Sequence, residues 1–162
     1  MTGVTRTGWL AFALAAVVIV VDQALKHWVV TDLGLTTGES RAVLWPLSFT
    51  LVRNEGISFG FFQTQAAWTR WALAGFSMAV SVALALWVRR ADKTITGLAA
   101  GLILGGALGN LIDRLRLGAV VDFVDVHPLI FPWVFNVADS AITVGVIILL
   151  ADSLLLAGKA RA

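Results

Sequence analysis

Four long apolar stretches constrain this chain more than any other feature of its sequence. They run approximately over residues 9–30, 66–88, 95–115 and 136–157. Each is long enough to cross a bilayer core, which takes about 20 helical residues. The chain has 59% hydrophobic and 14% charged residues, which is too apolar for a soluble domain of 162 residues. The sequence therefore predicts one integral membrane domain over residues 1–162 with four transmembrane helices.

Basic residues predict the orientation of these helices. Short cytoplasmic connections of membrane proteins are enriched in Lys and Arg. The residues that decide the orientation flank the chain ends and the connection between the second and third stretches: Arg6, Arg89, Arg90, Lys93, Lys159 and Arg161. We therefore expect both termini in the cytoplasm and the two longer connections, residues 31–65 and 116–135, on the outer side.

The two outer connections carry strand-like patterns. Within residues 31–65, β-branched and aromatic residues partly alternate up to a turn signal at Asn54-Glu55-Gly56. This pattern predicts a small sheet on the outer membrane surface. Residues 116–135 are also apolar and strand-like, and they predict an apolar platform at the interface. The expected fold class is thus a membrane all-α protein with a small β part.

Costly polar residues gather at one depth of the predicted helices. Counted along the helices, the outer parts of the first, third and fourth carry Asp22, Lys26, Asn110, Asp113, Arg114, Asn136, Asp139 and Ser140. Scattered structural residues have no reason to agree in depth, whereas a site between helices does. Ionisable groups inside a membrane are functional candidates, so the sequence predicts a site near the outer surface.

Several of these residues also have simpler interpretations. Asp22 and Lys26 are four positions apart on one helix face, which favours a self-neutralising ion pair. Arg114 has the chemistry to hold a carboxylate or a substrate carbonyl, but Asp113 is an alternative partner that would neutralise it. We interpret both groups as support for a site.

Asp122 and Asp139 lack a cationic partner at helical spacing. Two carboxylates brought together in apolar surroundings share a proton, so that one acts as a general base on water and the other as a general acid. Sequence spacing alone does not establish their distance. Asp125 competes with Asp122 for the same role.

Other chemistries have less support. His127 with Asp122 and Asp125 suggests a metal, yet the chain has two histidines, no cysteine and no HExxH motif, so we expect no metal site. A serine nucleophile with a lysine base, Ser140 and Lys26, stays open. A small proton- or ion-coupled carrier is the alternative function. A net charge of +2 gives no reason to expect nucleic acid.

A glycine repeat in the third stretch predicts close helix packing. Gly97, Gly101, Gly105 and Gly109 recur every four residues, a spacing that lets another helix backbone approach closely.

Taken in order, the motifs identify a family resemblance. The chain resembles bacterial lipoprotein signal peptidase, also called signal peptidase II, a four-span aspartyl protease. The blocks that carry the resemblance are "DQALK", "LVRNEGISFG", "GGALGNLIDRLRLGAVVDF" and "FNVADSAI". It implies a cytoplasmic (inner) membrane protein with its active site at the outer, periplasmic face, an outer β-cradle and a second outer connection.

The resemblance also implies roles for individual residues. Asp122 and Asp139 would be the catalytic pair, which settles the competition with Asp125. The motif residues that would bind substrate or support the site are Asp22, Lys26, Asn54, Gly56, Asn110, Arg114, Asn136 and Ala138. The implied reaction is cleavage of diacylglyceryl-modified prolipoproteins just before the lipidated cysteine, with no cofactor. We expect membrane lipid as a partner, a monomer, and a loop at Asn54–Gly60 with Phe61 and Phe62 that closes over substrate.

Overall fold

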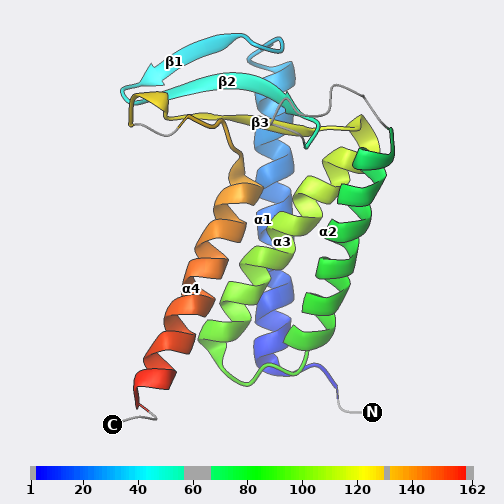
Figure 1. The fold of residues 1–162 in the computed structure, drawn as a ribbon, viewed down its shortest axis with the longest axis vertical. Coiled ribbons are helices and arrows are strands. Elements are labelled where there is room, and N and C mark those ends of the chain that lie inside the picture. Colours follow the sequence, from blue (N-terminus) through cyan, green and yellow to red (C-terminus); the bar gives the residue numbers. More distant parts are fainter. Residues whose placement is uncertain (1–2, 57–66, 130–131, 160–162) are drawn as a thin grey trace.

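The computed structural model describes residues 3–56, 67–129 and 132–159 (Figure 1). Its helices are α1 (Arg6–Thr31), α2 (Ala67–Val88), α3 (Thr94–Leu117) and α4 (Val137–Lys159). All four are long and apolar enough to span a membrane. The prediction of four membrane-length helices is therefore confirmed, with ends within a few residues of those expected.

Helix α3 is the central helix of the bundle and packs against α1, α2 and α4. Its glycines allow this, because a Cβ atom on Gly101 would lie 2.6 Å from the Ala11 carbonyl oxygen, and one on Gly105 would lie 2.8 Å from that of Ala15. Gly145 of α4 makes an equally close approach to the Ala99 carbonyl oxygen of α3. The predicted packing role of the glycine repeat is confirmed, since only a residue without a side chain fits such contacts.

A three-stranded antiparallel sheet crosses one end of the bundle, and the chain ends lie at the other (Figure 1). The strands are β1 (Ser40–Leu44), β2 (Leu47–Asn54) and β3 (Val120–Asp125), in the order β1-β2-β3. A short 3-10 helix, His127–Leu129, follows β3. The predicted small sheet is present, and the strand β3 of the second outer connection pairs with β2 and completes it.

The sheet is fixed to the bundle by a small apolar core. Val29 of α1 packs with Leu51 of β2 and with Val121 and Phe123 of β3, all of them buried. Gly118, with a φ of +82°, ends α3 and turns the chain directly into β3. These contacts place the start of β3 and the start of α4 next to the buried polar residues of α1 and α3.

Candidate functional site

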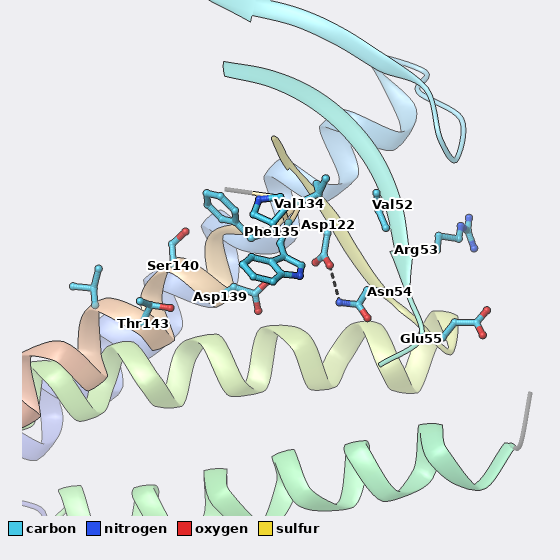
Figure 2. A pocket seen from close by; sticks show the side chains of 13 residues that line it. Val52, Arg53, Asn54, Glu55, Asp122, Val134, Phe135, Asp139, Ser140 and Thr143 are labelled. Carbon is cyan, nitrogen blue, oxygen red and sulfur yellow. Dashed lines mark hydrogen bonds between the residues drawn. The ribbon is translucent and has the colours of Figure 1, made fainter. Parts of the chain in front are cut away.

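A cavity of about 970 Å³ opens between the sheet and the start of α4 (Figure 2). Its lining residues are Val52, Arg53, Asn54, Glu55, Asp122, Pro132, Trp133, Val134, Phe135, Asp139, Ser140, Thr143 and Val144. Asp122 reaches the cavity from β3 and Asp139 reaches it from the first turn of α4. The structure thus brings the two sequence-predicted aspartates to one cavity.

Asp122 is a buried carboxyl group held by two amides. Its side chain is 1% exposed. Asn54 donates from Nδ2 to Oδ2 over 3.0 Å, and Asn136 donates from Nδ2 to Oδ1 over 2.7 Å. Burial raises the pKa of Asp122 to about 6, more than the Asn54 hydrogen bond lowers it, and the charge of Asp139 raises it further. This carboxyl group therefore takes up a proton more readily than an ordinary aspartate.

Gly56 fixes the orientation of Asn54. The Gly56 N–H donates to Oδ1 of Asn54 over 2.8 Å, which leaves the Asn54 amide nitrogen facing Asp122. Gly56 has a φ of +91°, a conformation that other residues rarely adopt. A Cβ atom there would also collide with the Leu73 side chain of α2. Both motif residues at this turn thus act on the Asp122 carboxyl group.

Asn136 and Asp139 cap the start of α4 reciprocally. The Asp139 N–H donates to Oδ1 of Asn136 over 2.9 Å, and the Asn136 N–H donates to Oδ2 of Asp139 over 3.3 Å. Such a capping box satisfies backbone donors that a helix start leaves unpaired. The sequence signal, an Asn followed three positions later by an acidic residue, was present but was not interpreted as a cap. Asp139 is therefore fixed to the backbone that carries it.

Asn110 of α3 connects Asp139 and Asn136 to the helices behind them. It donates from Nδ2 to Oδ1 of Asp139 over 2.7 Å and accepts from the Asn136 amide over 3.1 Å. Arg114, one turn later on α3, is close enough to interact electrostatically with Asp139 and Asp122. The predicted motif residues of α3 and α4 thus form one polar group around the cavity.

Asp22, Lys26 and Asp113 form a buried ionic group behind the cavity. Lys26 Nζ lies 2.7 Å from Oδ2 of Asp22 and 2.7 Å from Oδ2 of Asp113. The predicted Asp22–Lys26 pair is confirmed. Asp113 is bound to Lys26 of α1, and it also interacts electrostatically with Arg114, to a smaller extent than Asp139 and Asp122 do. Ala138 joins this group through its N–H, which donates to Oδ1 of Asp22 over 2.9 Å.

The competing candidates form hydrogen bonds with other groups. Asp125 accepts from the Thr50 hydroxyl over 2.6 Å and from the His127 N–H, and it does not line the cavity. Residues an odd number of positions apart face opposite sides of a strand, which separates Asp125 from Asp122. The Ser140 hydroxyl donates to the Asn136 carbonyl oxygen, whereas the Lys26 ammonium donates to Asn110 besides its two carboxylates. The geometry therefore gives no support to a serine–lysine pair.

The expected closing loop, Asn54–Gly60 with Phe61 and Phe62, lies outside the described residues beyond Gly56. Gln23 was missed, although it stands in the "DQALK" block. Its amide donates to Oδ1 of Asp113 over 2.8 Å and to the Gly109 carbonyl oxygen over 3.2 Å. Its position next to Asp22 was the available signal.

The family described as signal peptidase (SPase) II matches residues 14–155 of the chain. A lipoprotein signal peptidase of Caulobacter vibrioides is 51% identical over 153 residues, which covers 94% of this chain and 90% of the relative. One of Methylobacterium radiotolerans is 44% identical over 156 residues, covering 92% and 86% respectively. Both share nearly their whole length with this chain.

A solved structure, described as a bacterial membrane enzyme, has the same fold. It superposes with a TM-score of 0.79 at 29% sequence identity, and the match covers 95% of this chain and 97% of that one. The arrangement of four helices and an attached sheet is therefore shared with an enzyme of bacterial membranes.

Proposed function

Because this chain belongs to the signal peptidase II family, aspartic endopeptidases that remove signal peptides from lipoproteins, we propose that Asp122 and Asp139 are the pair that performs its reaction. One observation carries the proposal. The two carboxyl groups reach one cavity from different elements and share Asn136, whose amide contacts Asp122 and whose side-chain oxygen caps Asp139. A shared hydrogen-bonding residue keeps two acids at a fixed separation.

The pair works with a single proton. This proton resides on Asp122, because burial raises the pKa of Asp122 to about 6, within about one unit of neutral pH. Asp139 accepts hydrogen bonds from Asn110 and from the Asn136 backbone. Asp139 then serves as the general base and Asp122 as the general acid.

The reaction needs one water molecule and no covalent intermediate with the enzyme. Asp139 takes a proton from water while the water oxygen bonds to the scissile carbonyl carbon, and Asp122 gives its proton to the carbonyl oxygen. The tetrahedral species then loses its C–N bond as Asp139 returns a proton to the leaving nitrogen. Reformation of the carbonyl group returns a proton to Asp122. The products are a signal peptide with a free carboxyl group and a lipoprotein with a free amine.

The shape of the cavity suits a lipidated substrate. Val52, Trp133 and Val144 give its wall an apolar character, and Val144 lies on an exposed part of α4. A diacylglyceryl-modified prolipoprotein can enter laterally from the bilayer, with its acyl chains beside α4 and the peptide between α4 and the sheet. Arg114 is suited to hold a substrate carbonyl group.

The chain is an inner-membrane protein, and we place its site at the outer, periplasmic face with both termini in the cytoplasm. The basic connection around Arg89 and Arg90 supports this orientation, as does the position of both chain ends away from the sheet (Figure 1). We expect the sheet to form a cradle on the outer leaflet, in contact with lipid. A monomer is sufficient for this mechanism, since both acids come from one chain, and it uses no metal or organic cofactor.

Cleavage of a diacylglyceryl-modified prolipoprotein by purified protein tests the pair. We expect Asp122→Asn and Asp139→Asn each to lose cleavage at least about 1,000-fold while remaining folded, because either change removes a proton acceptor or donor that the reaction needs. Asp125→Asn is the matched control on the same strand and should keep wild-type cleavage per folded protein.

Ser140→Ala separates this mechanism from a serine nucleophile. We expect it to keep most of the activity, because the Ser140 hydroxyl is bound to the Asn136 carbonyl oxygen. Full activity in either Asp→Asn variant of the pair contradicts the proposal. Loss of activity in Ser140→Ala together with a trapped acyl-enzyme would favour the serine route.

A further inference from the structure

A buried ionic group of α1 and α3 lies behind the cavity without lining it. Asp22, Lys26 and Asp113 are 0%, 4% and 3% exposed. We call these three residues the buried triad. The three protons of the Lys26 ammonium have three acceptors, since Nζ contacts both carboxylates and Oδ1 of Asn110. The triad is thus fully bonded and makes no contact that the proposed chemical steps use.

Each carboxylate of the triad also accepts one backbone N–H. Asp113 Oδ2 accepts from the Val121 N–H over 3.2 Å, and Asp22 Oδ1 accepts from the Ala138 N–H over 2.9 Å. Val121 is the residue immediately before Asp122, and Ala138 is the residue immediately before Asp139. The two N–H donors therefore belong to the residues that immediately precede the two proposed catalytic residues.

We infer that the buried triad is a positioning device that sets the separation of Asp122 and Asp139 through the backbone, an inference that rests on the proposed catalytic pair. Asp113 holds the start of β3, Asp22 holds the start of α4, and Lys26 joins the two carboxylates. Hydrogen bonds to charged acceptors are shorter and stronger than neutral ones. The ammonium thus fixes one strand and one helix to a common point on α1.

Gln23 completes the connection. Its amide nitrogen lies 3.2 Å from Oδ2 of Asp22 and 2.8 Å from Oδ1 of Asp113, so it donates to both carboxylates of the triad. Two carboxylates around one ammonium carry a net negative charge, and a neutral donor between them offsets part of their repulsion. Gln23 is accordingly a second bridge between the two halves of the device.

A purely stabilising role is the alternative, and it predicts different kinetics. Buried ion pairs are poor sources of stability, because desolvation offsets much of their attraction. A positioning role predicts a loss in kcat with little change in KM, since the triad does not line the cavity. Displacement of reacting groups by about 1 Å costs on the order of 100-fold in rate.

The test uses Asp22→Asn, Asp113→Asn and the double variant in the full chain, with diacylglyceryl-modified prolipoprotein in detergent micelles. Asparagine keeps an oxygen that can accept the backbone N–H but loses the ionic contact to Lys26, whereas alanine would leave both donors unpaired and endanger folding. We expect each single variant to lower kcat by about 10- to 100-fold with KM within about twofold. The kcat of the double variant should lie within about threefold of the kcat of the slower single variant, because the effects of groups that act as one unit are not additive.

Asp152→Asn is the matched control. Asp152 joins α4 to α3 at the opposite end of the bundle, where it accepts from the Thr96 hydroxyl over 3.4 Å. We expect its kcat to be that of the wild type. All rates refer to folded protein, measured by tryptophan fluorescence and size-exclusion chromatography.

Two results overturn the inference. One is a wild-type kcat per folded protein in Asp22→Asn or Asp113→Asn, and the other is a double variant whose losses multiply. If Asp122→Asn and Asp139→Asn are inactive, either result refutes the positioning role and leaves the catalytic pair in place. Activity in those two variants refutes the catalytic pair itself, whatever the triad variants do.

Discussion

The side-chain nitrogen of Asn136 donates to Oδ1 of Asp122 over 2.7 Å, and the side-chain oxygen of Asn136 accepts from the Asp139 N–H at the start of α4. One side chain therefore has two separable tasks. Its amide nitrogen orients the Asp122 carboxyl group on β3, and its amide oxygen caps the start of α4. Substitutions that keep one task and remove the other can distinguish them.

Asn136→Ser should keep the helix cap and lose the bond to Asp122. Serine is a good N-cap, whereas Asn136→Ala loses both functions. We expect both variants to lower kcat by about tenfold, since a buried polar group left without its hydrogen-bond partner costs about 1–3 kcal/mol. Asn136→Ala should lose about 1 kcal/mol more of unfolding free energy than Asn136→Ser, because it alone loses the cap. Equal unfolding midpoints for the two variants would contradict the capping role.

Asp122→Asn should stabilise the fold in alkaline solution. Burial raises the folded-state pKa of Asp122 from 3.8 to about 6, so its contribution to stability is complete below about pH 4 and is lost as the pH rises through 6. Removal of the charge should increase the unfolding free energy by on the order of 1–3 kcal/mol at pH 8 and by little at pH 4. Thermal unfolding in detergent at both pH values measures this difference.

Asp125→Asn provides the control of opposite sign. The Thr50 hydroxyl holds the pKa of Asp125 below its ordinary value, so this carboxylate stabilises the fold above that value and loses its contribution as the pH falls. Its replacement should lower the unfolding midpoint at pH 8. The same direction of change in Asp122→Asn and Asp125→Asn would refute the electrostatic assignment.

Asn54→Leu should move the alkaline limb of the kcat profile to higher pH. The Asn54 hydrogen bond lowers the pKa of Asp122, and its loss leaves burial less opposed, so Asp122 keeps its proton to a higher pH. Steady-state cleavage from pH 5 to pH 9 measures the limb. Thr50→Val, which removes the corresponding donor from Asp125 on the same strand pair, should leave the limb in place. A downward shift in Asn54→Leu would mean that Asp122 is not the acid.

Gly101→Leu should destabilise the bundle by more than about 1–3 kcal/mol, the usual range for overpacking. Its Cβ atom would lie 2.6 Å from a backbone oxygen of α1, and backbone cannot yield as a side chain does. Gly75→Leu on α2 is the control, since a Cβ atom there meets nothing within 4 Å. Urea or thermal unfolding of both variants in detergent gives the comparison, and equal losses would refute a specific seam between α1 and α3.

The sequence predicted the parts of this fold that depend on the length of the apolar runs and on the spacing of residues along a helix. Four apolar runs predicted four helices, and the common depth of Asp22, Asn110 and Asn136 predicted that polar groups from three helices would lie together. Both predictions follow from the cost of polar groups in lipid, which acts on each residue according to its own depth. The glycine spacing likewise predicted a close approach of another helix to α3, and the structure shows that α1 is such a helix.

The contacts that depend on direction were harder to predict. Adjacent helical residues point about 100° apart, so Asp113 next to Arg114 in sequence faces a different neighbour, Lys26 of α1. The pairing of β3 with β2 joins segments from two different connections, and no local pattern records it. The hydrogen bonds of the Val121 and Ala138 N–H groups could not be predicted either, because their acceptors lie on α3 and α1, in other parts of the sequence.

The central position of α3 also sets when the helix bundle can assemble during synthesis of the chain. Helices α1 and α2 are synthesised first, yet they contact each other little and each packs mainly on α3. A nascent chain that ends after α2 therefore holds two membrane helices with no common partner, and the bundle can close only when α3 enters beside them. The strand β3 and the helix α4 follow at once. The last segments made are thus those that bring the second aspartate to the first.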